Sequence, residues 1–297
     1  MNRILACFAP VSIAALLVAC GGSSASSAPA GAPSAAGAAA PASGTDAATD
    51  AKIRASLAGA QRTDKEKARD AYRHPLETLE FLGLRDDMTV VELSPGAGWY
   101  TAVLAPVLRD RGKLIVAGGD PNGDPNSEGT KNAQALRDRF QKDPQAFGKV
   151  QAIVVARDKP WVLGAPESAD MVLTFRNFHN WVGGGTIDGV LKSVFAVLKH
   201  GGVFGVTDHR ANPGAPTDAK TVGHTGYVPE AYVIQLAEAA GFKLAGKSDV
   251  NANPRDTKDY PKGVWTLPPT YELGDQDRAK YEAIGESDRM TLRFVKP

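Results

Sequence analysis

Cysteine is almost absent from this sequence, since the two that occur, Cys7 and Cys20, both lie within the first twenty residues. Everything downstream lacks a thiol, which excludes a disulfide scaffold, a cysteine zinc site and a cysteine nucleophile from the folded part of the chain. A surplus of either charge is also missing, because 34 Lys and Arg face 33 Asp and Glu. A nucleic-acid partner is therefore not expected, as binding to a phosphate backbone needs a basic surplus.

The apolar stretch within residues 1–19 is too short to cross a bilayer as a permanent helix, and it follows Arg3. This arrangement indicates a signal peptide. The tetrapeptide from Leu17 to Cys20 resembles a bacterial lipobox, which implies that Cys20 is lipidated and that acyl chains anchor the protein to a membrane. The residue that follows is Gly21, which by the same resemblance favours the outer membrane, facing the periplasm. The alternative is a cysteine that simply ends an ordinary signal peptide.

The next segment has almost no apolar side chains larger than alanine. Between Gly21 and Asp50 all but four of the thirty residues are Ala, Gly, Ser or Pro. Such a composition supplies no core and predicts a flexible linker with a reach of about 30 Å. We therefore expect a signal peptide over 1–19, a low-complexity linker over 20–50 and a folded domain over 51–297, and a chain that begins near Ala51 should fold and stay soluble.

Hydrophobic residues make up 43% of the whole chain, which is enough for a core. From Lys52 onward, helical and strand-like apolar patterns alternate. This alternation predicts one α/β domain with a doubly wound, mostly parallel sheet of seven strands. The expected strands are 89–93, 113–117, 150–156, 170–175, 203–207, 242–247 and 290–295. The expected helices are 64–82 (interrupted near Pro75), 99–109, 130–142, 187–199 and 229–240.

A glycine turn follows the first expected strand. Such a turn lets a ligand approach backbone N–H groups at the positive N-terminus of a helix. The residues Glu92, Gly96 and Gly98 resemble the acid-and-glycine motif of the class I S-adenosylmethionine-dependent methyltransferases, with Ser94 in place of the first glycine. The resemblance implies a Rossmann-like fold and S-adenosyl-L-methionine as the cofactor.

Other segments arrive in the order of that family. Residues 169–180 are similar to the Phe-x-x-Arg-Asn stretch of quinone C-methyltransferases, although the spacing differs by two residues. Residues 197–202 are similar to the turn before the family's fifth strand, and 238–242 match the Ala-Gly-Phe that ends its next helix. The resemblance covers about Asp64 to Pro297 and is closest to a bacterial group of predicted, often secreted methyltransferases. It leaves the acceptor an unidentified small molecule.

The resemblance also assigns residues to the cofactor: Glu92, Ser94, Gly96, Gly98, Tyr100, Asp120, Asp158 and Asn177. The place of the usual ribose-binding acid is held by Gly118, so either a longer loop brings Asp120 back or the ribose is not held. Asp158 matches the position that often contacts the adenine amino group. Glu92 is alternatively a buried carboxylate tied to backbone donors. Tyr100, next to the turn, is expected to attract the sulfonium by a cation–π contact.

Methyl transfer from a sulfonium is an in-line displacement, so the protein chiefly aligns the reactants and excludes water. An oxygen or carbon nucleophile still needs a base, and histidine is suited to that near neutral pH. His179 and His209 follow strands at the carboxyl edge of the sheet, and we expect them to flank the acceptor as catalytic residues. The alternatives are two structural histidines, or a metal site made of Asp208, His209 and His224, which no typical ligand spacing supports.

Two functions therefore stay open at the level of sequence. The first is a lipid-anchored methyltransferase that acts on a small molecule, which the intact turn and the histidines at the sheet edge favour. The second is a non-catalytic lipoprotein that retains the methyltransferase fold and binds another small molecule or a partner. The departures at Ser94 and Gly118 favour the second, because a fold alone does not give a function.

Overall fold

The computed structural model describes residues 44–156 and 159–297. The expected signal peptide, Cys20 with its predicted lipidation, most of the expected linker, and Asp158 lie outside the described residues. Across the residues that are described, no helix is both long enough and apolar enough to cross a membrane.

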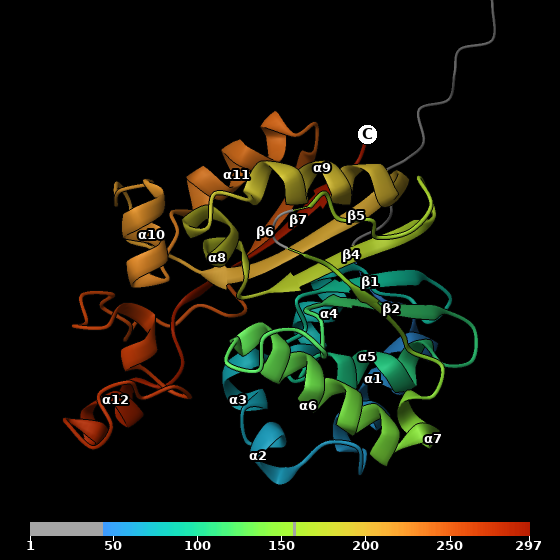
Figure 1. Ribbon diagram of the computed structural model, residues 1–297, viewed down its shortest axis with the longest axis horizontal. Helices are drawn as coiled ribbons and strands as arrows, with labels where there is room; N and C mark the ends of the chain where they lie inside the picture. The colour runs from blue at the N-terminus through green and yellow to red at the C-terminus, as the bar shows by residue number, and fades with distance from the viewer. Residues whose placement is uncertain (1–43, 157–158) are drawn as a thin grey trace, which may run out of the picture. The chain divides into compact units, whose positions relative to one another are not determined.

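The core of the fold is a seven-stranded sheet with the order β3-β2-β1-β4-β5-β7-β6 (Figure 1). The pairings among β1 to β5 are parallel, and β7 runs antiparallel to both of its neighbours, β5 and β6. This confirms the doubly wound, mostly parallel sheet expected from the sequence. The strands are β1 (Thr89–Leu93), β2 (Lys113–Gly118), β3 (Gln151–Val154), β4 (Ala169–Phe175), β5 (Leu198–His209), β6 (Lys243–Ser248) and β7 (Arg289–Val295).

Helices cover both faces of the sheet, with α9 and α11 over one face and α1, α4, α5 and α6 over the other (Figure 1). The helices before β4 are α1 (Ala47–Ala58), α2 (Asp64–Lys67), α3 (Asp70–Arg73), α4 (Pro75–Leu82), α5 (Thr101–Leu108), α6 (Glu128–Lys142) and α7 (Pro144–Phe147). Those after it are α8 (Phe178–Gly183), α9 (Ile187–Val197), α10 (Ala219–Thr225), α11 (Glu230–Ala239), the 3-10 helix η1 (Gly263–Thr266) and α12 (Arg278–Ile284).

The two helical layers create two apolar cores, one on each face of the sheet. Successive side chains of a strand point to opposite faces, so Val90 of β1 packs in the core that contains α4 and α5, whereas Val91 packs in the core that contains α9 and α11. Both valines are fully buried. A strand covered on both sides therefore needs a continuous apolar run, which β1 supplies up to the point where Glu92 interrupts it.

The folded part begins earlier than the expected boundary at residue 51. Helix α1 starts at Ala47, and the side chain of Asp46 caps it by accepting a hydrogen bond from the Thr49 backbone at 2.8 Å. Thr49 itself is fully buried, and its hydroxyl oxygen accepts a hydrogen bond from the Asp86 backbone at 3.1 Å. The last residues of the expected linker thus belong to the fold.

Candidate functional site

The turn between β1 and α5 has the backbone that a ligand site at a helix N-terminus needs. Ser94, Gly96 and Gly98 have φ angles of 48°, 60° and 87°, the left-handed region that glycine adopts at least cost. A Cβ added at Gly98 would lie 2.6 Å from a Leu136 methyl group, whereas one added at Gly96 would meet no atom within 4 Å. Gly98 therefore allows α6 to pack closely, and the backbone at Gly96 borders open space.

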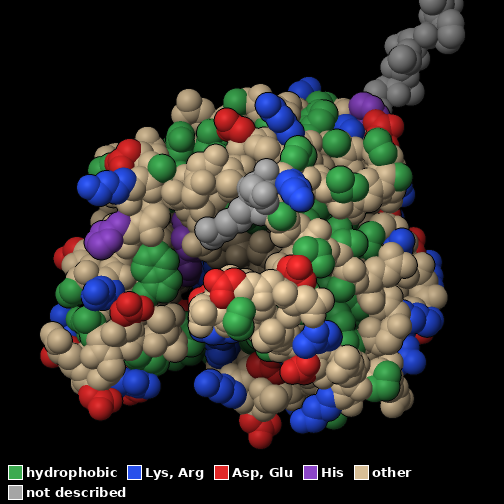
Figure 2. All heavy atoms as spheres, in the orientation of Figure 1, with side chains coloured by type: hydrophobic (Ala, Val, Ile, Leu, Met, Phe, Trp, Pro, Cys, Tyr) green, Lys and Arg blue, Asp and Glu red, His purple; other side chains and the backbone are tan. Residues whose placement is uncertain are grey.

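That open space consists of two cavities that meet at the turn and share the lining residues Ser94, Pro95, Gly96 and Asn132. The large cavity has a volume of about 780 Å³ and lies at the carboxyl ends of β1, β2 and β3, next to α6 and α8. The small cavity has a volume of about 320 Å³ and lies on the side of α3 and β4. In Figure 2 the surface is hollowed near the middle of the face shown. The strand order reverses between β1 and β4, which is where sheets of this class place their ligands.

The large cavity contains the loop that follows β2. Gly118, Gly119 and Asp120 all line it. The Asp120 carboxylate accepts a hydrogen bond from the Asn122 backbone at 2.8 Å, so a tight local turn holds the loop in place. The loop thus brings Asp120 to the cavity, and its contact with a ribose stays a prediction.

Glu92 and Tyr100 line the small cavity rather than the large one. Glu92 is 2% exposed, and its carboxylate accepts a 2.6 Å hydrogen bond from the Thr101 hydroxyl. Burial raises the pKa of Glu92 to about 7, against the effect of that hydrogen bond. Tyr100 is also buried, which raises its pKa to about 12, and its ring stacks on Phe175 with 3.4 Å between ring centroids. Both side chains are thus fixed by protein contacts and also border the cavity.

Two polar side chains hold the turn in place. The Asn177 amide group donates to the carbonyl oxygens of Leu93 and Ser94, each at 3.2 Å, and so ties the end of β4 to the end of β1. Arg139 of α6 donates to the Ala97 carbonyl at 3.3 Å. Asn177 also lines the large cavity, so a contact with the ligand is compatible with its clamping role.

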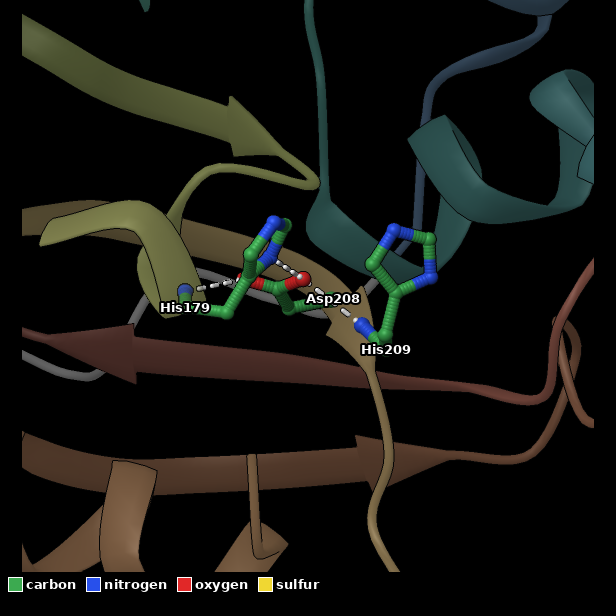
Figure 3. Close-up of side chains that lie close together, drawn as sticks. All are labelled: His179, Asp208 and His209. Atoms are coloured by element: carbon green, nitrogen blue, oxygen red, sulfur yellow. Dashed lines mark hydrogen bonds and ion pairs between the residues drawn. The ribbon is translucent and has the colours of Figure 1, made fainter. Parts of the chain in front are cut away.

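His179 and His209 are brought together at the ends of α8 and β5, with 5.1 Å between their ring centroids (Figure 3). Asp208 lies between them and is fully buried. It accepts hydrogen bonds from the His179 backbone at 2.9 Å and from His179 Nδ1 at 2.8 Å. A carboxylate only accepts, so Nδ1 of His179 carries a proton, and Nε2 is the nitrogen that offers a lone pair when the ring is neutral. Neither histidine lines the two cavities described above.

His209 is held differently from His179. Its Nδ1 lies 2.5 Å from the hydroxyl oxygen of Ser287, which comes just before β7. Burial lowers the pKa of His209 well below its usual value, and the neighbouring His179 and Arg176 lower it further. His209 is therefore neutral near neutral pH.

A cation fits this trio poorly, although His179, Asp208 and His209 bring ligand-type atoms within 4.8 Å of one another. The two Asp208 oxygens already accept three hydrogen bonds, two from His179 and one from the His209 backbone at 2.7 Å. Nearby arginines add positive charge. The metal alternative that used His224 is not assembled either, because His224 is exposed in α10 and lies outside this group of ligand atoms.

Sequence reasoning missed a cluster of charged residues beside the small cavity. Glu286 forms ion pairs with Arg69 at 2.6 Å, with Arg73 at 3.1 Å and with Arg289 at 3.1 Å. Arg176, at the end of β4, lines the small cavity together with Arg69 and Arg73. These five residues, which we call the arginine cluster, come from α3 and the residue before it, from the residue after β4, and from the start of β7 and the segment before it, so no sequence motif could reveal them. The one available signal was the Arg-Asn pair after β4.

Comparison with known proteins identifies the fold. No family model matches the chain, and no curated protein matches its sequence. Among solved structures, an S-adenosylmethionine-dependent methyltransferase from Aquifex aeolicus is similar with a TM-score of 0.51 and 16% identity over 84% of this chain and 98% of its own. The [4+2]-cyclase SpnF is similar with a TM-score of 0.54 and 15% identity over 84% of this chain and 94% of its own. At such identities the likeness shows the fold alone.

Proposed function

We propose that the protein is an S-adenosylmethionine-dependent methyltransferase that acts on a small-molecule acceptor. The observation that carries this proposal is the turn at Gly96, where left-handed backbone faces open space at the junction of two cavities on the carboxyl edge of the sheet. The volume of the large cavity lies within the roughly 300–1,000 Å³ typical of small-molecule sites. The fold shared with the Aquifex aeolicus methyltransferase supports the same conclusion.

The residues present fit such a cofactor. The large cavity offers the backbone of Gly118 and the Asp120 carboxylate for hydroxyl groups, and the small cavity offers Glu92 for an ammonium group. When bound, S-adenosyl-L-methionine supplies a methyl group on a sulfonium, whose carbon–sulfur bond breaks as the acceptor forms its new bond to the methyl carbon. Asp208 orients His179, and Nε2 of His179 takes up the proton that the acceptor loses.

Calorimetry with S-adenosylhomocysteine tests this proposal. In the Gly96→Val variant a branched side chain enters the open space at φ 60°, so the affinity should fall at least about tenfold. The matched control is Gly201→Val, because Gly201 has a φ of 76°, also has no atom within 4 Å of an added Cβ, and lines neither cavity. The control should carry the same backbone strain and bind normally.

A wild-type protein that gives no heat with S-adenosylhomocysteine or S-adenosylmethionine would defeat the proposal. The second candidate, a lipoprotein that binds another small molecule on this fold, would then be tested by mass spectrometry of what co-purifies. The solved [4+2]-cyclase shows that a similar fold carries a differently named reaction.

For location, we propose that the chain is exported and anchored by lipid on Cys20, on the periplasmic side of the outer membrane. The support is sequence alone: the short apolar stretch, the tetrapeptide that ends at Cys20, the small-residue linker behind it, and the resemblance to an often secreted bacterial group.

A further inference from the structure

The arginine cluster holds more positive charge than its one carboxylate can neutralise. Arg69, Arg73, Arg176 and Arg289 surround Glu286, which leaves three positive charges over. Burial raises the pKa of Glu286, yet the four arginines outweigh it and lower this pKa to about 2, so the carboxylate is already fully ionised near neutral pH. A buried group of like charges is costly unless a counter-ion accompanies it.

Several hydrogen-bond donors of the cluster have no acceptor. Arg73 is 3% exposed, and its Nη2 is buried with no hydrogen-bond partner among the described residues, as is Nη2 of Arg69. The guanidinium of Arg176 makes no hydrogen bond or ion pair with any described residue. All three arginines line the small cavity.

We infer that the acceptor of the proposed methyltransferase is an oxyanion, a small molecule whose carboxylate or phosphate group binds Arg73 and Arg176 at the small cavity; this inference rests on the proposed function. Guanidinium groups suit both oxyanions, because their planar N–H donors match pairs of oxygen atoms.

The donor molecule does not account for the cluster. S-adenosyl-L-methionine has one carboxylate, one ammonium and one sulfonium, so it brings a net positive charge to a pocket that is already positive. Even when its carboxylate pairs with one arginine, two positive charges of the cluster stay unneutralised. Asp208 acts on Arg176 and offsets part of this charge, and an anionic acceptor would offset more of it.

Arg176 also lies where an acceptor is needed. Its backbone N–H donates to the Thr207 carbonyl at 2.7 Å, which continues the ladder between β4 and β5. Its charge acts on Asp208 and lowers the pKa of His209. The φ of Arg176 is 63°, a left-handed conformation that is strained for a residue with a side chain. An anion on Arg176 would therefore lie at the small cavity, at the end of β4, the strand next to the one that carries Asp208 and His209.

The test uses calorimetry on the full chain saturated with S-adenosylhomocysteine, at constant ionic strength. The bound homocysteine carboxylate fills any site that belongs to the donor, so an additional anion reports the acceptor site. The probes are benzoate and inorganic phosphate, and the one that binds distinguishes a carboxylate acceptor from a phosphate acceptor. We expect one probe to bind and its affinity to fall at least tenfold in Arg176→Gln, a larger loss than that of the affinity for S-adenosylhomocysteine.

The matched control is Arg111→Gln, which removes the same charge from an exposed arginine that pairs with Asp86. It should leave the affinities for the probe and for S-adenosylhomocysteine unchanged. Without ligand, Arg176→Gln should melt at a higher temperature than wild type, because the variant relieves like-charge repulsion. A purely structural arginine would lower the melting temperature instead.

The calorimetry distinguishes a failure of this inference from a failure of the proposed function. If wild-type protein binds S-adenosylhomocysteine but neither probe, or if Arg176→Gln binds the probe as tightly as wild type, the oxyanion acceptor is wrong and the proposed function stands. If S-adenosylhomocysteine itself gives no heat, the proposed function and the acceptor assignment are both wrong.

Discussion

Glu92 is a carboxyl group inside an apolar strand, and its ionisation should make stability depend on pH. Its pKa is raised from 4.5 to about 7, so between these values the folded protein keeps a proton that the unfolded chain has lost. Stability is therefore lost as pH rises through this window. Glu92→Gln removes this pH dependence. The unfolding free energy of the variant minus that of wild type should therefore rise by about 2–3 kcal/mol from pH 5 to pH 8, because one pKa unit corresponds to about 1.4 kcal/mol.

Urea denaturation at the two pH values measures this gain. Glu272→Gln is the control, since Glu272 is exposed and its neutralisation should change little at either pH. An equal effect of Glu92→Gln at pH 5 and pH 8 would show that the carboxyl group ionises normally inside the fold.

The pair of His179 and Asp208 should matter for turnover more than for binding. His179→Gln keeps a donor for the buried Asp208 carboxylate but removes the basic nitrogen, so the rate should fall about 10²- to 10⁴-fold while the affinity for S-adenosylhomocysteine is retained. The rate is measured as S-adenosylhomocysteine formed with an oxyanion acceptor. His200→Gln, which changes an exposed histidine near the start of β5, should keep the wild-type rate. Equal rates for all three proteins would make His179 a structural residue.

Sequence could identify the histidines and the turn but not what surrounds them. The turn is contiguous, so its glycines are visible as a motif, and the histidines follow from the rule that ligands lie at the carboxyl ends of parallel strands. The arginine cluster is different, because Arg69 and Glu286 are more than two hundred residues apart in the chain. Their proximity depends on the tertiary fold.

At the scale of elements, the first helix depends on a residue that composition had assigned to the linker. Asp46→Ala removes the side chain that caps α1 and should lower the unfolding free energy by about 1 kcal/mol. Asp46→Asn is the control, because an amide oxygen accepts the same hydrogen bond from Thr49. Urea denaturation of both variants measures the effect. If the cap contributed nothing to stability, Asp46→Ala and Asp46→Asn would both have the unfolding free energy of wild type.

The strands were predictable because burial on both faces demands continuous apolar runs such as Val90 and Val91. The ends of the strands were less predictable from the sequence. β5 extends to His209 because β7 pairs with it as far as the contact between His209 and Arg289, a partner that local sequence does not show. The short helices α8, α10 and α12 were not expected, since each of them has too few residues to display a helical period.

At the scale of the whole molecule, the proposed anchor gives a prediction about cell fractionation. Cys20→Ser should move the protein from the membrane fraction to the soluble fraction, because each buried acyl CH₂ contributes about 0.8 kcal/mol of membrane affinity. Cys7→Ser is the matched control and should stay in the membrane fraction, as Cys7 lies within the expected signal peptide. A Cys20→Ser protein that is equally membrane-bound and has an unmodified N-terminus would contradict the anchor.

The position of β7 has a consequence for the order of assembly during synthesis. This strand is inserted between β5 and β6, and among the described strands β6 pairs only with β7. Glu286, Ser287 and Arg289 arrive with it. A growing chain therefore cannot complete its sheet, or place Glu286 among the arginines of α3 and β4, until the ribosome has released residue 295. If the chain leaves the cytosol as it is made, the acceptor site first exists on the far side of the inner membrane.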